Sequence, residues 1–115
     1  MPDLAPDAEV YCFDIDGTIC TEMAGDCENA QPIKSRISII NQLYDRGATI
    51  YLMTARGMLG AENNQQVADE NMRELTETQL KEWGVSYHQL FFGKPRAMHY
   101  VDDKGWNDSD FFRQF

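Results

Sequence analysis

The sequence is short of positive charge and has no long apolar run, and each shortage excludes a class of protein. Its 10 lysines and arginines are outnumbered by 19 aspartates and glutamates, which gives a formal net charge of −9. Because a general nucleic-acid binder needs a basic surface to displace counterions, this balance argues against a nucleic acid as the partner. No apolar stretch approaches the roughly 20 residues of a membrane-spanning helix, so we expect no membrane partner either.

Cysteine is also scarce, since only Cys12, Cys20 and Cys27 are present. An odd number at this spacing matches neither a disulfide framework nor a zinc-binding pattern. The start of the chain, MPDLAPDAEVY, lacks the basic segment and the apolar segment that make up a signal peptide. Together these absences predict a cytoplasmic protein.

The length and composition are those of one ordinary globular domain. A chain of 115 residues, 43% of them hydrophobic, buries about two-thirds of its unfolded surface, which is enough for a single core. No repeat, linker or low-complexity segment divides the sequence. We therefore expect one domain over residues 1–115.

Short runs of apolar, β-branched and aromatic residues predict strands that are buried on both faces of a sheet. The clearest are EVYCF and ATIYLMTA, and HQLFFG and HYVDD follow later in the chain. The predicted strands cover residues 9–13, 48–55, 88–93 and 99–103.

The segment PIKSRISIINQLYDRG, residues 32–47, has the period of a helix. Ile37 and Ile40 recur at helical spacing, Pro32 suits the first turn, and Gly47 suits the position after the last turn.

A second helix is expected from about residue 64 to 74. A separate short helix should begin at a capping box made by Thr76 and Gln79. A last helix is expected at the C-terminus, with Asp108 or Ser109 as its cap. Strands that alternate with helices predict an α/β domain with a parallel sheet.

Polar side chains stand at or just after the end of each predicted strand. In open α/β sheets, ligands bind beyond the carboxyl ends of the strands. The sequence therefore predicts one site that gathers these groups. They are Asp14 and Asp16 from the first strand, Thr54 and Arg56 from the second, Lys94 after the third, and Asp102 and Asp103 from the fourth.

This set of groups has a chemical logic. Crowded carboxylates repel one another, and a hard cation such as Mg²⁺, which prefers oxygen ligands, relieves the repulsion. A lysine and a threonine hydroxyl supply the charge and the donor that a phosphoryl group needs. Asp14 would then be the nucleophile that forms an aspartyl-phosphate, and Asp16 the acid and base. Gly17 would let the chain turn so that both carboxylates serve one site.

These residues resemble the motifs of the haloacid dehalogenase (HAD) superfamily of phosphohydrolases. The first motif, DxDx[TV], is DIDGT at residues 14–18, and the second is Thr54 in YLMTAR. The third is Lys94 in FFGKP, and the fourth is the pair Asp102 and Asp103 in YVDDKG. The motifs occur in the family's order, and the resemblance covers residues 9 to 105. It implies a Rossmann-like three-layer α/β/α sandwich.

The resemblance also implies roles for the acidic residues. Asp14 is the nucleophile and a Mg²⁺ ligand, and Asp16 is the acid and base and binds the metal through its main-chain carbonyl. Asp102 is a metal ligand, and Asp103 is either a ligand or a group that orients one.

The phosphoryl group is held by Thr54 and Lys94 in this comparison. For Arg56 two readings stay open, since it either binds substrate or simply faces solvent.

The chain looks closer still to small HAD hydrolases associated with capsule or surface-polysaccharide biosynthesis, as ICTEMAGDCENAQPIKSRISIINQLYDRG and QLKEWGVSYHQLFFGKP indicate. Most HAD enzymes cover the site with an inserted cap domain, but here residues 20–31 can form only a flap. An open site implies a bulky substrate, or a neighbouring subunit in a homo-oligomer that closes it.

We therefore expect a Mg²⁺-dependent phosphomonoester hydrolase that acts on a small phosphorylated metabolite such as a sugar phosphate. Two alternatives stay open. One is a polynucleotide 3′-phosphatase, against which the charge of −9 argues. The other is a non-catalytic binding or scaffold protein that retains the HAD fold.

Overall fold

The computed structural model describes residues 9–115, and the start of the chain, where the sequence shows no signal peptide, lies outside the described residues. Three parallel strands form one sheet in the order β1-β2-β3. Asp14 pairs with Met53 and Thr54 pairs with Phe92, so the carboxyl ends of the strands meet at one edge. The strands are β1 (Val10–Asp14), β2 (Thr49–Thr54) and β3 (Gln89–Phe92).

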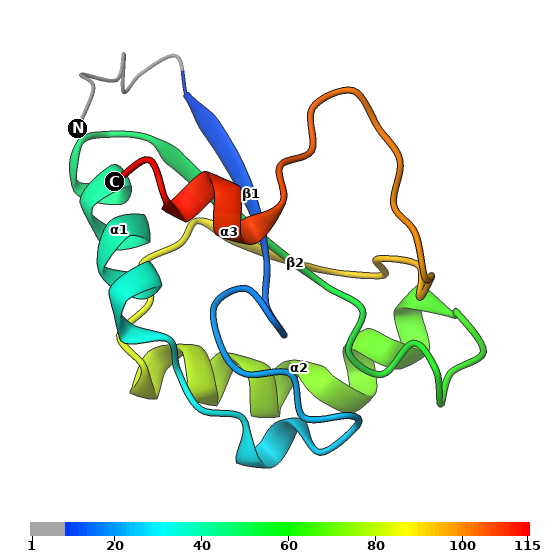
Figure 1. Cartoon of the computed structure of the whole chain (residues 1–115). Coiled ribbons are helices and arrows are strands. Elements are labelled where there is room, and N and C mark those ends of the chain that lie inside the picture. Colours follow the sequence, from blue (N-terminus) through cyan, green and yellow to red (C-terminus); the bar gives the residue numbers. More distant parts are fainter. Residues whose placement is uncertain (1–8) are drawn as a thin grey trace.

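Two helices cover one face of this sheet (Figure 1). The two longer helices follow β1 and β2 in the chain, and the short C-terminal helix packs beside β1 at the edge of the sheet. The opposite face, which carries Cys12 and Phe91, is exposed. The predicted α/β fold with a parallel sheet is therefore confirmed, and within residues 9–115 its helices form one layer rather than the expected two. No helix within residues 9–115 is both long and apolar enough to cross a membrane. The helices are α1 (Lys34–Asp45), α2 (Gln65–Glu82), α3 (Asp108–Phe112) and the 3-10 helix η2 (Cys27–Asn29).

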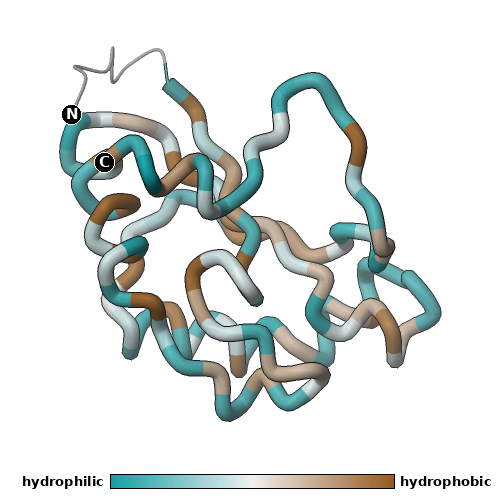
Figure 2. Tube along the Cα trace, viewed as in Figure 1, coloured by the Kyte–Doolittle hydropathy of each residue, from teal (hydrophilic) through white to brown (hydrophobic). Residues whose placement is uncertain are grey.

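The core lies between the sheet and the two longer helices. α1 contributes Ile37, Ile40 and Leu43, which recur at helical spacing and are buried as predicted. In Figure 2 hydrophobic stretches alternate with hydrophilic ones along this helix. The helix ends at Asp45 and is capped by Arg46. Gly47 follows with a φ of 96°, a conformation that favours glycine, and the chain turns there into β2. The strands add Ile50 and Leu52, both fully buried.

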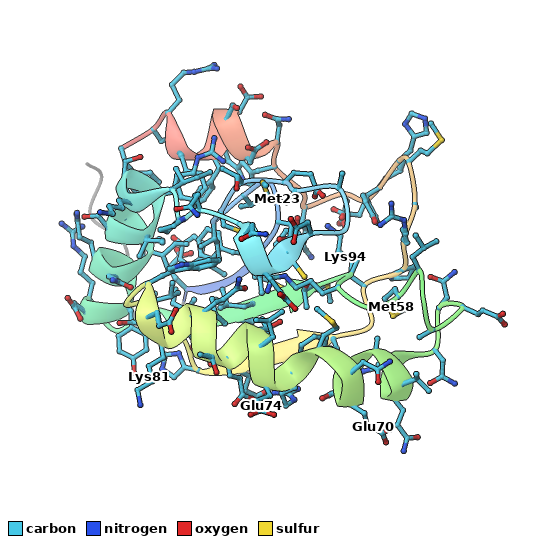
Figure 3. The ribbon with its side chains drawn as sticks, turned by 90° about the horizontal axis from the view of Figure 1, so that it is seen from below. Met23, Met58, Glu70, Glu74, Lys81 and Lys94 are labelled. Atoms are coloured by element: carbon cyan, nitrogen blue, oxygen red, sulfur yellow. The ribbon has the colours of Figure 1, made fainter. Side chains whose placement is uncertain are left out.

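α2 is one continuous helix of 18 residues, so the prediction of two helices separated by a capping box is wrong. Thr76 and Gln79 do not cap anything, because both are buried inside α2. The outer face of the helix carries Glu70, Glu74 and Lys81, which point away from the sheet in Figure 3. A polar residue on the buried side of a helix needs a partner in the interior.

The fourth predicted strand, residues 99–103, does not form, and no strand in the described part of the chain covers the outer edge of β1. The segment between β3 and α3 is instead an exposed loop that arches away from the sheet (Figure 1, orange). Its local chemistry explains the difference. The Asp102 carboxylate accepts hydrogen bonds from the backbone N–H groups of Lys104, at 2.7 Å, and of Gly105. Such an Asx-type turn competes with an extended ladder.

α3 packs against β1 and α1 with aromatic side chains. The ring centroid of Phe13 on β1 lies 5.5 Å from that of Phe111 and 5.9 Å from that of Phe112. The helix was predicted, but its cap is Asn107, whose side chain accepts from the backbone N–H of Ser109, and not the residues expected.

Candidate active site

The strand ends bring three of the predicted site residues together. Asp14 is the last residue of β1, Thr54 is the last residue of β2, and Lys94 follows β3 after one glycine. The Nζ atom of Lys94, labelled in Figure 3, lies 3.5 Å from Oδ1 of Asp14. The backbone N–H of Lys94 donates to the carbonyl of Thr54 at 3.2 Å, which fixes the two segments side by side.

The chain leaves the strand directly after Asp14, as the sequence required. The carbonyl of Ile15 accepts backbone hydrogen bonds from Thr18 at 3.1 Å and from Ile19 at 2.8 Å, which closes a tight turn. Gly17 in this turn has a φ of 84°, a conformation that residues with a Cβ rarely adopt. Within this turn the backbone of Asp16 pairs with that of Cys20.

Asp14 lies in a mixed electrostatic environment. Burial raises its pKa above the ordinary value for aspartate, and the neighbouring carboxylate of Asp16 acts in the same direction. The charge of Lys94 and the backbone N–H of Ile15 oppose this shift. The side chain of Asp14 is still one-third exposed, so a reacting group can reach it.

The second predicted carboxylate, Asp16, is held by Arg56. Nε of Arg56 donates to Oδ2 of Asp16 at 2.9 Å, and Nη2 donates to Oδ1 at 3.0 Å. This is the two-pronged geometry that a guanidinium makes with a carboxylate. The Arg56 side chain is 2% exposed, so the structure places it in the interior, neither facing solvent nor open to a substrate.

Two further residues complete the surroundings of Arg56, and the sequence reasoning missed both. Nη1 of Arg56 donates to Oε1 of Gln79 at 2.5 Å and to the hydroxyl of Thr76 at 3.2 Å. The available signal was their position on α2, since they lie at helical spacing from the buried Ala68 and Leu80. Polar side chains in a buried stripe indicate an internal partner.

Thr54 is buried, at 1% exposed, whereas Lys94 is half-buried and reaches solvent, and both retain hydrogen-bond donors. Oγ1 of Thr54 accepts from the backbone N–H of Arg56 at 3.0 Å, so its hydroxyl still has a proton to donate. The ammonium of Lys94 lies 4.2 Å from the ring centroid of Tyr100, in a cation–π contact, and its three N–H donors exceed the one that Asp14 engages.

The predicted metal ligands do not come together in this structure. Asp102 and Asp103 lie on the exposed loop between β3 and α3, and residues 9–115 contain no group of three acidic, histidine or cysteine side chains that could hold an ion. Asp14 is paired with Lys94, and both carboxylate oxygens of Asp16 are engaged by Arg56. The donor set is thus incomplete, and the arrangement does not by itself make a Mg²⁺ site.

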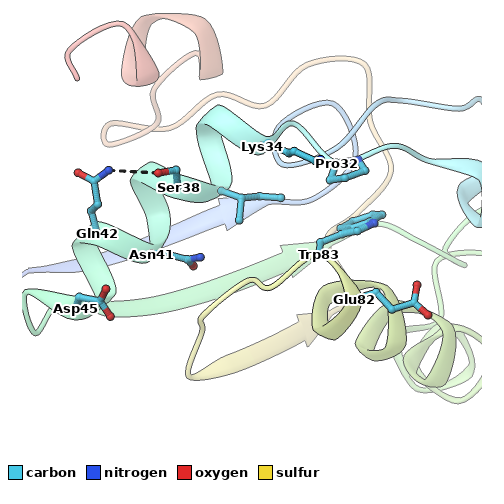
Figure 4. A pocket seen from close by; sticks show the side chains of 9 residues that line it. Pro32, Lys34, Ser38, Asn41, Gln42, Asp45, Glu82 and Trp83 are labelled. Carbon is cyan, nitrogen blue, oxygen red and sulfur yellow. Dashed lines mark hydrogen bonds between the residues drawn. The ribbon is translucent and has the colours of Figure 1, made fainter.

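A separate groove of about 470 Å³ lies between α1 and the end of α2 (Figure 4). Its walls include Ile37 and Trp83, and its rim includes Lys34, Asp45 and Glu82. None of the strand-end residues lines it, so it is distinct from the candidate active site.

Comparison with known proteins gives fold likenesses only. No protein-family model matches the chain, and no curated protein matches it either. The crystal structure of an MCSG target from Vibrio cholerae is similar, with 26% sequence identity and a TM-score of 0.82 over 90% of this chain and 87% of that chain.

Two more distant structures are also similar. One is D,D-heptose 1.7-bisphosphate phosphatase from B. bronchiseptica complexed with magnesium and phosphate, at 13% identity and a TM-score of 0.53, over 78% of this chain and 52% of that chain. The other belongs to the Pnkp1/Rnl/Hen1 complex, at 15% identity and a TM-score of 0.58, over 85% of this chain and 32% of that chain. These likenesses show that the chain has the HAD-like α/β fold. Residues 9–115 contain no inserted cap domain.

Proposed function

We propose that this protein is a HAD-type phosphatase that hydrolyses a phosphomonoester through an aspartyl-phosphate at Asp14. The observation that supports the proposal most is the convergence of Asp14, Thr54 and Lys94 at the carboxyl edge of the sheet, with Nζ of Lys94 3.5 Å from Oδ1 of Asp14. A nucleophile, a hydroxyl donor and a fixed positive charge at one edge are the groups that phosphoryl transfer requires.

The first half of the reaction forms the intermediate. A carboxylate oxygen of Asp14 attacks phosphorus, and the bond from phosphorus to the leaving oxygen breaks. Asp16 donates a proton to that oxygen, which leaves as an alcohol. Lys94 and Thr54 hold the phosphoryl oxygens as negative charge is redistributed over them.

The second half returns the enzyme to its starting state. Asp16, now deprotonated, takes a proton from water, and the water oxygen attacks the phosphorus of the aspartyl-phosphate. The bond from phosphorus to the oxygen of Asp14 breaks, and inorganic phosphate is released. One carboxylate thus serves as acid and then as base.

We propose Mg²⁺ as the cofactor of this reaction. Its ligands would be Asp14 and the main-chain carbonyl of Asp16, with Asp102 and Asp103 joining only if the loop between β3 and α3 moves toward β1. One similar structure, the heptose bisphosphate phosphatase, is described as complexed with magnesium. When bound, the ion would offset the repulsion between the carboxylates and the phosphoryl group.

We propose a small phosphorylated metabolite such as a sugar phosphate as the substrate and the cytoplasm as the location. The net charge of −9 argues against the alternative of a polynucleotide 3′-phosphatase. A role in polysaccharide biosynthesis and a homo-oligomer that covers the open site remain predictions from the sequence.

The test is phosphate release, with Mg²⁺ present, from sugar phosphates, nucleotides and a 3′-phosphorylated oligonucleotide, with the Asp14→Asn variant as the control. We expect release from a sugar phosphate by the wild-type protein and none by the variant. Release only from the oligonucleotide, with a steep salt dependence, would favour the 3′-phosphatase. A folded protein that binds Mg²⁺ and releases phosphate from nothing would favour the binding-protein alternative.

A further inference from the structure

The flap, residues 20–31, is fastened at its base but has few contacts elsewhere. Its two ends are joined where the backbone N–H of Thr21 donates to the carbonyl of Gln31 at 2.9 Å. The N–H of Gln31 donates in return to the hydroxyl of Thr21, also at 2.9 Å. Most of the segment between them is exposed or half-buried, and η2 has no buried residue. Contacts that hold η2 therefore decide where the flap lies.

One such contact comes from the interior of α2. Nε2 of Gln79 donates to the carbonyl of Cys27 at 2.7 Å and approaches the carbonyl of Glu28 at 3.5 Å. Gln79 is buried and stands 52 residues from Cys27 in the chain. Its amide thus joins the flap to the helix that packs beneath the sheet.

The other end of the same amide contacts Arg56. Oε1 of Gln79 accepts from Nη1 of Arg56 at 2.5 Å. The orientation of the amide is fixed by chemistry, because a guanidinium and a backbone carbonyl require an acceptor on one side and a donor on the other. Gln79 is therefore the residue that can bridge these two groups, and glutamate could bridge only one of them.

Arg56 completes the connection to the proposed acid and base. Its Nε and Nη2 hold both oxygens of Asp16, and its Nη1 is held by Thr76 and Gln79. Within residues 9–115 no buried side-chain nitrogen or oxygen lacks a hydrogen-bond partner. A continuous path runs from the Asp16 carboxylate through Arg56 and Gln79 to the backbone of the flap at Cys27.

We propose that Arg56 and Gln79 are positioning residues for Asp16, and that Gln79 couples the orientation of Asp16 to the position of the flap. This inference rests on the proposed function, since it assigns Asp16 as the acid and base. Arg56 sets the plane of the Asp16 carboxylate. Gln79 in turn positions Arg56, and the position of Gln79 depends on its hydrogen bond to the flap at Cys27. The flap and the proton-transfer group therefore act as one unit, and a substrate beneath a seated flap meets an oriented Asp16.

The first test measures the flap and needs no turnover. In Gln79→Glu the side chain still accepts from Arg56 but cannot donate to the Cys27 carbonyl. We expect the backbone amides of residues 27–30, such as that of Ala30, which donates to the Cys27 carbonyl at 3.2 Å, to exchange hydrogen at least about tenfold faster. The matched control is Gln66→Glu, which makes the same charge change at an exposed position of α2. Unchanged exchange in Gln79→Glu, or equal acceleration in both variants, would overturn the coupling.

The second test measures the positioning of Asp16. Arg56→Lys keeps the charge but loses the planar fork that holds the carboxylate. A misplaced proton donor slows substrates with a poor leaving group, such as an alkyl phosphate, more than p-nitrophenyl phosphate, whose leaving group needs little protonation. We expect kcat to fall at least about tenfold more on the alkyl phosphate, with KM changed little, and a smaller loss of the same kind in Gln79→Glu. Gln66→Glu should be indistinguishable from the wild type.

The two tests separate this inference from the proposed function. Equal losses on both substrates in Arg56→Lys, with phosphate release intact in the wild type, would overturn the positioning role alone. If the wild-type protein releases no phosphate, the catalytic part falls with the proposed function, and the exchange measurement still decides whether Gln79 holds the flap. Circular dichroism of each variant shows whether it is folded before either result is interpreted.

Discussion

Asp16 and Asp102 were predicted to serve one site, yet their surroundings differ in almost every respect. Asp16 is held on both oxygens by a buried arginine that belongs to a network spanning β1, β2, α2 and the flap. Asp102 is exposed on a loop, and its carboxylate accepts from the backbone of Lys104 and Gly105, next to it in the chain. Those N–H groups lower the pKa of Asp102 and keep it ionised, but they give it no fixed place relative to Asp14.

The difference shows what positions a functional carboxylate. The tight turn after β1 fixes where the backbone of Asp16 lies, and distant partners fix where its side chain points. Asp102 has neither, because its predicted strand does not form. We therefore regard the neighbourhood of Asp14 and Asp16 as the organised half of the site and the loop that carries Asp102 as its unorganised half.

The largest effect is expected from Asp14→Asn, which removes the proposed nucleophile from the organised half. Phosphate release should fall at least about 1,000-fold, because an amide does not form the covalent intermediate. The variant should stay folded, since Asp14 is one-third exposed and its partner Lys94 is also accessible to solvent. Phosphate assays and circular dichroism check both statements. Near-normal release by a folded variant would remove Asp14 from the mechanism.

The next effect concerns stability and separates the two halves most clearly. Arg56→Met takes away the cation that pairs with Asp16 and leaves Thr76 and Gln79 without their donor. Removing one partner of a buried ion pair costs about 3–5 kcal/mol of unfolding free energy, and we expect the lower end because Asp16 is partly exposed. Urea unfolding measures the loss. A variant as stable as the wild type would show that the network contributes little.

Asp102→Asn is the matching change in the unorganised half. The urea midpoint should not move, because the exposed side chain contacts only its own turn. If Asp102 joins the metal when the loop moves, the Mg²⁺ concentration for half-maximal phosphate release should rise at least about tenfold. The same Mg²⁺ dependence as in the wild type would exclude Asp102 as a ligand.

The smallest effect is expected at a surface pair far from either carboxylate. Arg73 donates to Asp69 at 2.6 Å, and this hydrogen bond is the main cause of the lowered pKa of Asp69. A lowered folded-state pKa stabilises the protein above the ordinary pKa of aspartate, and the gain is lost as the pH falls through the lowered value. Asp69→Asn should cost less than about 1 kcal/mol at pH 7, and less at about pH 3, because the gain fades as the pH falls from the ordinary pKa of aspartate through the lowered one. Urea unfolding at both pH values tests this. An equal cost at both would show that the charge is not responsible.

Much of the fold could be predicted because its signals are local. The apolar runs of β1, β2 and β3 and the repeat of Ile37 and Ile40 depend only on neighbouring residues. The strand-end positions of Asp14 and Thr54 followed directly from the strands.

The parts that could not be predicted depend on contacts between distant residues. Whether 99–103 forms a strand depends on whether pairing with β1 outweighs the turn at Asp102, and a single segment does not contain that information. Arg56 had two readings because its partners, Asp16 and Gln79, lie 40 and 23 residues away. Thr76 was taken for a cap because a capping box and a buried polar pair have the same local pattern.

The most direct test of the central claim is to trap the phosphoryl group on the protein. Asp16→Asn is incubated with p-nitrophenyl phosphate and Mg²⁺, quenched in acid and digested. Without the base for the second step, the intermediate should accumulate, because the nitrophenol leaves without a proton donor. The account predicts one added phosphoryl group on the peptide that contains Asp14 and none in the double variant Asp14→Asn, Asp16→Asn. Turnover by the wild-type protein with label on another residue would contradict it.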